Sequence, residues 1–327
     1  MSDLLTDVLV VGGGPAATWA ALKAAEDGAR VVLADKGWCG TSGATAAGGT
    51  GVWYVPPEPA AREAAMASRE GLGGYLADRR WMARVLDETY DRINELAVEG
   101  RYPFPTGTDG QPLRGGLQGP EYMRRMRVRV RRAGVRILDH SPVTELLTDR
   151  DGAVAGAAGH RRQAGELGRA GRRPARAVPR LGQRRHLAGR RGRRGGAPPD
   201  GERRRAPRPP RGGGTRTGEV LPYDKNYLRH GEGLSEALRS LDAGWAQLRA
   251  RLHGEGAGLV KARQAAAMTA HARWMYASAL ARTESRGMAR RLDHPEQDPA
   301  QHHRILAGGL DRVWAGPAAG RGTGVAV

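Results

Sequence analysis

The sequence predicts an α/β fold with a parallel sheet in its N-terminal half, followed by an α-helical C-terminal domain. In the N-terminal half, short β-branched strands alternate with Ala-rich helical segments, and a glycine-rich turn joins the first strand to the first helix. In the C-terminal half, two long helical patterns at residues 233–252 and 259–281 carry no strand pattern. A length of 327 residues fits roughly two domains of ~150 residues each.

The first strand, at residues 7–11, runs into a turn with the pattern Gly-x-Gly-x-x-Ala. Gly12 permits the tight turn, Gly14 lets the backbone approach a pyrophosphate, and Ala17 keeps the following helix close to the strand. This order of strand, glycines and helix predicts a dinucleotide site. A glycine-rich turn without a ligand is the alternative.

The helix after this turn and the strand after the helix complete the predicted site. Phosphates are expected at the helix N-terminus, beside Pro15 and Ala16, where backbone N–H groups are free. The second strand, at residues 30–34, ends at Asp35. Its carboxylate is placed to accept hydrogen bonds from the adenosine ribose, and its charge argues against a 2′-phosphate.

A loop of small and hydroxyl-bearing residues follows at 41–51 and suits a backbone wrapped around a pyrophosphate and a flat ring. The residues predicted to bind the cofactor here are Thr41, Ser42, Thr45, Gly48 and Gly49. Cys39 is the single cysteine, so an intrachain disulfide is excluded. A packing role for Cys39 is favoured over a reactive thiol, because no activating base is nearby.

On these residues the chain resembles the flavoprotein subunits of fumarate reductase and succinate dehydrogenase, with L-aspartate oxidase and adenylylsulfate reductase as relatives. The shared features are the opening glycines, the acid–lysine pair Asp35-Lys36, and a Ser/Thr/Ala loop that ends in Gly48-Gly49. The resemblance implies a Rossmann-like FAD/NAD(P)-binding domain and an FAD-dependent oxidoreductase. Respiratory members attach FAD through a His of this loop. The matching position is Ser42, which implies non-covalent FAD.

Helices and strands alternate between residues 59 and 157. The expected elements are two helices within 59–99 joined near 71–74, a basic helix at 121–132, and strands at 135–138, 143–147 and 153–157. The resemblance implies that the backbone near Val143 contacts adenine. The arginines of the basic helix are expected to form a solvated helix face, and this is favoured over a role in binding phosphate.

The string Arg282-Thr283-Glu284-Ser285-Arg286-Gly287 follows the second long helix and resembles the C-terminal domain of the same flavoproteins. A structural ion pair between Glu284 and Arg286 is favoured. Asp298-Pro299 predicts the N-cap and first position of a last short helix. His294, His302 and His303 are favoured as polar residues, because no carboxylate or Cys pattern completes a metal site.

Residues 159–218 carry most of the charge: 19 Arg, no Lys and 3 acidic residues, or +16 of the formal +19. The stretch has no aromatic residue and few large apolar ones, so we expect it not to fold. It is interpreted as an Arg-Gly-Gly RNA-binding segment, a basic linker, or a GC-rich gene read out of frame. RNA-binding segments usually carry stacking aromatics, which argues against the first. The third is favoured, because Arg, Gly, Pro and Ala are the residues that GC-only codons encode, and because the resemblance stops at about Gly159 and resumes at about Glu219.

We expect four segments: an FAD-binding part at 1–158, the arginine-rich segment at 159–218, a helical domain at 219–315 and a tail at 316–327. The resemblance implies hydride transfer through FAD on a dicarboxylate-like substrate, with an iron–sulfur electron-transfer subunit as partner. No stretch matches the capping domain or the later FAD segment of those flavoproteins. No catalytic residue is therefore assigned, and impaired turnover is expected. A non-catalytic nucleotide-binding fragment is the alternative.

Charge and hydropathy bound the remaining function classes. Outside residues 159–218 the chain has 34 basic and 31 acidic groups, which argues against a basic nucleic-acid-binding face. No run approaches ~18 apolar residues, so membrane insertion is not expected. The apolar run at residues 8–11 is too short for a signal-peptide core, and the expected location is the cytoplasm.

Overall fold

The computed structural model describes residues 4–161, 165–171, 220, 222–251 and 256–318. The chain forms two compact units. The first joins Met1–Pro57 to Val85–Pro198, and the second joins Glu58–Arg84 to Pro199–Val327. Residues 58–84 thus group with the C-terminal half of the chain. The four predicted segment limits stay predictions, and most of the arginine-rich stretch lies outside the described residues.

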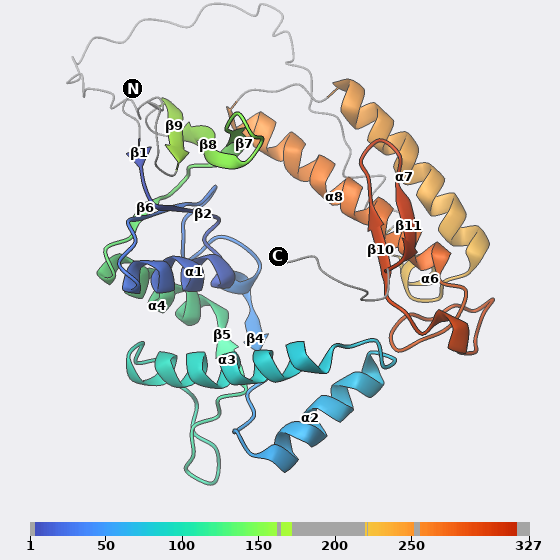
Figure 1. The fold of residues 1–327 in the computed structure, drawn as a ribbon, viewed down its shortest axis with the longest axis horizontal. Coiled ribbons are helices and arrows are strands. Elements are labelled where there is room, and N and C mark those ends of the chain that lie inside the picture. The colour runs from blue at the N-terminus through green and yellow to red at the C-terminus, as the bar shows by residue number, and fades with distance from the viewer. Residues whose placement is uncertain (1–3, 162–164, 172–219, 221, 252–255, 319–327) are drawn as a thin grey trace, which may run out of the picture. The chain divides into compact units, whose positions relative to one another are not determined.

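The first unit is built on a parallel sheet with the strand order β2-β3-β6. Helix α1 (Pro15–Glu26) connects β2 (Val8–Val11) to β3 (Val31–Ala34), and helix α4 (Gly119–Arg132) precedes β6 (Arg136–Leu138). Every residue of β3 is buried, because apolar layers cover both faces of this central strand. Both helices lie on one face of the sheet (Figure 1).

A second layer of strands packs against the other face. It has the order β1-β9-β8-β7 and consists of β1 (Leu4–Leu5), β7 (Val143–Thr148), β8 (Val154–Arg161) and β9 (Gly165–Gly171). Strand β9 corrects the expectation that the chain from residue 159 does not fold. Its backbone pairs in parallel with β1 and antiparallel with β8, so ladder hydrogen bonds form where few apolar side chains are available.

Two short strands and a turn lie beyond the sheet. Strand β4 (Gly49–Gly51) pairs antiparallel with β5 (Gly116–Gln118), and the 3₁₀ turn η1 (Thr45–Ala47) precedes β4. Helix α3 (Arg79–Val98) adds buried side chains to the core that also holds α1 and α4. The boundary between the two units falls within α3.

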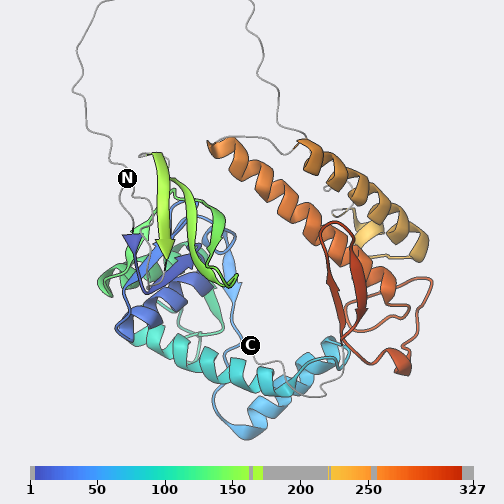
Figure 2. The same ribbon diagram turned by 45° about the horizontal axis from the view of Figure 1, so that its top comes forward.

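The second unit is mainly helical. Its elements are α2 (Pro59–Leu72), α6 (Tyr223–Asn226), α7 (Gly231–Arg251), α8 (Gly256–Ala281), the short η2 (Pro299–Gln301), and strands β10 (Ile305–Gly308) and β11 (Trp314–Pro317). Helices α7 and α8 lie side by side (Figure 2) and bury Leu234, Leu241 and Tyr276 in one core. Among the helices that the structure describes, none combines the length and apolar character needed to cross a membrane.

The short helix predicted at Asp298-Pro299 is confirmed as the 3₁₀ helix η2, where the Asp298 side chain accepts from the Ala300 amide. The β10–β11 hairpin corrects the expectation of a tail from residue 316, because Gly316 and Pro317 belong to β11. The two strands pair antiparallel, and α8 holds the turn between them. Trp274 Nε1 donates to the Gly309 carbonyl at 2.7 Å, and Arg273 donates to the Leu310 carbonyl at 2.7 Å. These tertiary contacts stabilise two four-residue strands whose sequence has no clear alternating pattern.

Candidate cofactor-binding site

The glycine-rich turn between β2 and α1 leaves its backbone open. Gly12 has a φ of +106°, which favours glycine, and its amide donates to the Ala34 carbonyl at 2.8 Å. Gly14 is the N-cap of α1 without a side-chain cap, and Pro15 follows at the start of the helix. A Cβ at Gly12 or Gly14 would meet no atom within 4 Å. The N-terminus of α1 is therefore accessible to a phosphate.

The middle glycine of the turn packs directly on the predicted ribose-binding acid. A Cβ built on Gly13 would lie 2.2 Å from Asp35 Oδ2 and 3.1 Å from the Cα of Cys39. No side chain fits at this position without moving the carboxylate or the backbone behind it. The Gly-x-Gly pattern leaves this position open, so sequence reasoning missed the requirement at Gly13.

The carboxylate of Asp35 faces the protein and organises the loop that follows it. Asp35 is 3% exposed. Its Oδ2 accepts a hydrogen bond from Ser42 Oγ at 2.5 Å, and its Oδ1 accepts one from the Gly37 amide at 3.1 Å. The structure thus brings Asp35 and Ser42 together beside the glycine turn. Contact with a ribose stays a prediction.

Arg127 of α4 and Asp139, which follows β6, hold the same loop through an ion pair that we call the Arg127–Asp139 clamp. Two parallel hydrogen bonds of 2.7 Å join the guanidinium to the carboxylate. Arg127 also donates to the Cys39 carbonyl at 2.8 Å, and Asp139 accepts from the Cys39 amide at 2.9 Å. Burial alone would raise the pKa of Asp139, but the hydrogen bonds from Arg127 and Cys39 lower it overall.

The clamp escaped sequence reasoning because its members come from separate elements. Arg127 lies 88 residues and Asp139 100 residues from Cys39 in the chain. The guanidinium of Arg127 also lies 4.1 Å from the centroid of the Trp38 ring, a cation–π contact that adds to the hold on the loop. The solvated face expected for the α4 arginines is therefore wrong at Arg127.

Cys39 packs inside the loop as the sequence predicts. Its side chain is fully buried, and burial raises its pKa to about 11 from the usual 9.0. A thiol with this pKa is almost entirely protonated at neutral pH and is a poor nucleophile. The Arg127–Asp139 clamp closes over its backbone.

The later part of the predicted loop is held by the start of α4. The Gly119 amide donates to the Gly48 carbonyl at 2.7 Å. A Cβ on Gly119 would lie 1.7 Å from the Thr45 carbonyl oxygen and 2.0 Å from that of Gly48, so only glycine fits there. Gly49 continues into β4 beside a cavity of about 640 Å³, which β5 and the preceding loop also line.

The remaining predicted residues lie at separate places. Lys36 and Thr41 are exposed, and the Thr41 hydroxyl donates to the Trp38 carbonyl at 3.5 Å. Ala16 is exposed in the first turn of α1. Val143 is the first residue of β7, where it pairs with Gly159 and packs on the second face of the sheet. The structure brings Gly13, Asp35 and Ser42 together, whereas Val143 belongs to the strand layer.

Two family models match the chain. One, described as FAD dependent oxidoreductase, matches residues 7–172, just over half of the chain. The other, described as Fumarate reductase flavoprotein C-term, matches residues 217–308. The chain belongs to the FAD-dependent oxidoreductases of the fumarate reductase and succinate dehydrogenase flavoprotein family. The α/β fold with a helical C-terminal region is confirmed, and the first match continues to residue 172 through strand β9.

Individual relatives cover different shares of this flavoprotein. An L-aspartate oxidase of Rhodospirillum rubrum is 38% identical over 133 residues, which are 40% of this chain and 43% of that protein. The Mycobacterium smegmatis Sdh1 complex in the apo form has a TM-score of 0.64 at 15% identity, covering 97% of this chain and 94% of that chain. That likeness shows the fold. FrdA of E. coli quinol fumarate reductase has a TM-score of 0.47 at 19% identity, covering 52% of this chain and 32% of that chain.

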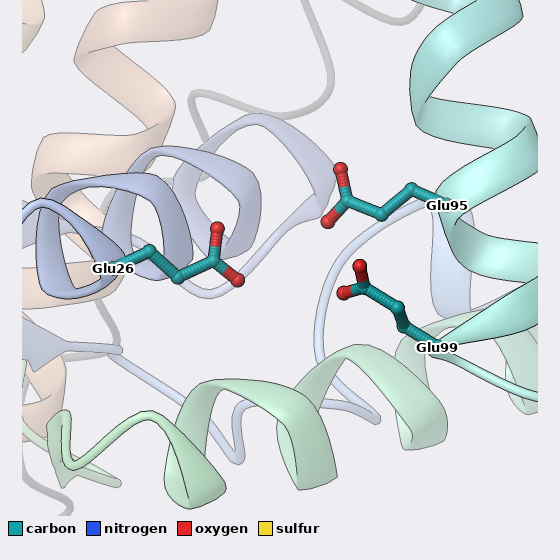
Figure 3. A group of neighbouring side chains, drawn as sticks. All are labelled: Glu26, Glu95 and Glu99. Atoms are coloured by element: carbon teal, nitrogen blue, oxygen red, sulfur yellow. The ribbon is translucent and has the colours of Figure 1, made fainter.

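Three carboxylates meet between helices of the first unit, at Glu26, Glu95 and Glu99 (Figure 3). Arg129 is 8% exposed and donates to Glu95 at 2.5 Å and to Glu99 at 2.8 Å. Lys23 donates to Glu26 at 2.7 Å and to Glu95 at 2.9 Å. Arg92 also donates to Glu95. Because three cations face the three carboxylates, we assign the cluster a structural role. The solvated-face expectation is therefore wrong at Arg129 as well.

In the second unit, the predicted pair of Glu284 and Arg286 is confirmed within a larger network. Arg286 donates to Glu284 at 2.7 and 2.9 Å, and the Asp298 amide donates to the same carboxylate at 2.8 Å. Arg282 donates to it at 2.5 Å. Burial raises the pKa of Glu284, but these hydrogen bonds outweigh it and hold the pKa at about 2. Arg286 also donates to the Gly74 carbonyl at 3.1 Å and so ties the α2–α3 turn to this network.

Proposed function

We propose that the first unit binds FAD without a covalent bond and that the chain serves hydride transfer to or from a dicarboxylate-like substrate. The proposal rests on one observation: the N-terminus of α1 is accessible, and Gly13 beside it packs directly on the buried Asp35 carboxylate. The backbone at Gly12 and Gly14 has room for a pyrophosphate, while Gly13 packs on Asp35. When bound, FAD supplies a ring that accepts or donates hydride.

The residues that would hold the cofactor lie on three elements. The first turn of α1 would bind the pyrophosphate through backbone N–H groups. Asp35, at the end of β3, is proposed to act on the adenosine ribose, and the backbone of Val143 on adenine. The cavity of about 640 Å³ beside β4 and β5 is a place for a flat ring, because backbone of Gly49, Gly51, Gly115 and Gly116 lines it.

Ser42 supports the non-covalent mode. Its hydroxyl donates to Asp35 at 2.5 Å, and it offers no imidazole for attachment to a flavin. We therefore expect the cofactor to be released when the protein is denatured. The test is to purify the protein, record the absorbance at the flavin bands, and precipitate it with acid. Yellow supernatant is the expected result. A protein that stays colourless with added FAD would contradict FAD binding, and yellow pellet would contradict the non-covalent mode.

Substrate, partner and location remain proposals. An iron–sulfur subunit is proposed as electron-transfer partner and the cytoplasm as location, on the family resemblance and on the sequence. We also infer impaired turnover, because no residue here matches the proton donor of the family's capping domain. A nucleotide-binding fragment without turnover is the second candidate, since the match to the L-aspartate oxidase spans 43% of that protein.

Turnover is tested separately from binding. The flavin of the loaded protein is reduced anaerobically with dithionite, and fumarate is then added. We expect the reduced flavin to persist for much longer than in a positive-control fumarate reductase, because no residue of the sequence matches the family's proton donor. Rapid reoxidation specific to fumarate would contradict the inferred impairment while leaving the binding proposal intact.

A further inference from the structure

A cavity of about 390 Å³ in the second unit is lined by five arginines, and three of them have no carboxylate partner in the described part of the chain. Its wall is formed by the last turns of α8, the segment from residue 282 to 291, Arg304 and β10, with Arg229 before α7 and Leu76 between α2 and α3. A volume of this size is within the range of small-molecule sites, about 300–1,000 Å³. All lining residues belong to the second unit, whereas the residues of the proposed flavin site belong to the first.

Two of the five arginines are fully engaged within the protein. Arg282 is 8% exposed and donates to Glu284 and to the Gln301 and His303 carbonyls. Arg291 is 5% exposed and forms a two-bond ion pair of 2.8 Å with Asp293. These residues form a rigid, neutralised part of the wall.

The other three arginines, Arg229, Arg290 and Arg304, supply uncompensated charge. Arg229 is half-buried and donates to the carbonyl and side-chain oxygens of Asn226 at 2.5 and 3.0 Å, which are neutral acceptors. Desolvation lowers the pKa of Arg229, as expected for a charge without a counter-ion. Arg290 and Arg304 are exposed at the rim.

The rest of the wall is mainly apolar. Its polar members are Ser278 and Glu284, whose carboxylate is paired with Arg282 and Arg286. Met275, Ala279, Ile305 and Leu306 face the same cavity. A cavity with cationic groups and an apolar wall suits a molecule with a carboxylate or phosphate group and an apolar body, since guanidinium groups match these oxyanions. We infer that this cavity, which we call the Arg229 cavity, is a binding site for a small organic oxyanion.

Calorimetric titration of the full chain with hexanoate, hexyl phosphate and hexanol tests the inference. We expect saturable binding of at least one anion and roughly tenfold weaker binding of hexanol, which has the same apolar body without the charge. The comparison of the two anions distinguishes a carboxylate ligand from a phosphate ligand. Failure of both anions to bind, or equal affinity for hexanol, would overturn the inference.

Substitutions locate the site. Arg229→Gln is expected to weaken anion binding about tenfold, and the exposed Arg304→Gln about threefold. Arg239→Gln, on an exposed part of α7 outside the cavity, is the matched control and should bind as the wild type does. If Arg229→Gln fails to fold by circular dichroism, Arg304→Gln and the hexanol comparison still decide. Wild-type anion affinity in both folded cavity variants would overturn the inference.

Discussion

At the residue scale, the site depends on which groups each side chain already satisfies. The Asp35 carboxylate accepts hydrogen bonds from the Ser42 hydroxyl and the Gly37 amide, so its first role is to shape the loop. Gly13 is required because the same carboxylate occupies the space of its Cβ. Cys39 is the single cysteine, is fully buried, and has a pKa of about 11. Its reactivity therefore reports directly on the state of this loop.

Removal of Arg127 is predicted to expose Cys39. Arg127→Ala eliminates two hydrogen bonds to Asp139 and one to the Cys39 carbonyl, so the loop opens more often. We expect labelling by a disulfide reagent at pH 8 to be about tenfold faster than in the wild type. The wild-type rate should rise with pH towards 11, as the thiolate fraction increases.

Arg124→Ala is the matched control for this experiment. Arg124 lies on the same helix but pairs with Glu121 at 2.7 Å on an exposed face. Its substitution should leave the labelling rate within about twofold of the wild type, as exposed pairs contribute little. Equal rates in wild type and Arg127→Ala would show that the clamp does not hold the loop.

At the element scale, the Glu284 network joins the α2–α3 turn to the segment after α8. Glu284 is fully buried and accepts from Arg282, Arg286 and the Asp298 amide. Glu284→Gln keeps the shape but leaves two arginines without their counter-ion. We predict a loss of about 3–5 kcal/mol in the free energy of unfolding, measured with urea at pH 7. Exposed Glu236→Gln on α7 should change it by less than about 0.5 kcal/mol.

The same network predicts a direction of pH dependence. The folded-state pKa of Glu284 is about 2, below its ordinary 4.5, so its stabilisation is fully present above pH 4.5. It is lost as the pH falls from 4.5 towards 2. The difference in unfolding free energy between wild type and Glu284→Gln should therefore shrink over this range. A difference that stays constant between pH 7 and pH 3 would contradict the network.

At the scale of the whole molecule, charge is concentrated in one stretch. Residues 172–218 contain 16 Arg and 2 acidic residues, or +14 of the formal +19. Any non-specific, salt-sensitive binding of RNA is predicted to be lost on deletion of 172–218, since such binding depends on arginines that neutralise RNA phosphates. FAD affinity should stay within about twofold, because none of the proposed cofactor residues lies there. A large loss of FAD affinity with unchanged RNA binding would contradict both expectations: that RNA binding depends on residues 172–218 and that FAD binding does not.

The sequence predicted the elements well where local pattern decides them. The turn from Gly12 to Ala17, the strands on either side and the long helices follow from glycine spacing and apolar periodicity. Contacts between distant segments were not predictable in this way. The contacts of Arg127 and Asp139 with Cys39, the pairing of β9 with β1, and the hydrogen bonds from α8 to the β10–β11 turn all depend on partners far away in the chain. The packing of Gly13 on Asp35 joins two separate elements in the same way.

The most direct test is to titrate the wild type, Gly13→Ala and Gly258→Ala with FAD. Binding is monitored by the quenching of flavin fluorescence. Gly13→Ala places a methyl group 2.2 Å from Asp35 Oδ2, whereas a Cβ on Gly258, in α8, meets no atom within 4 Å. We predict saturable binding by the wild type and Gly258→Ala, and at least about tenfold weaker binding by a folded Gly13→Ala. Absence of binding by the wild type, or equal affinity in all three proteins, would contradict the account.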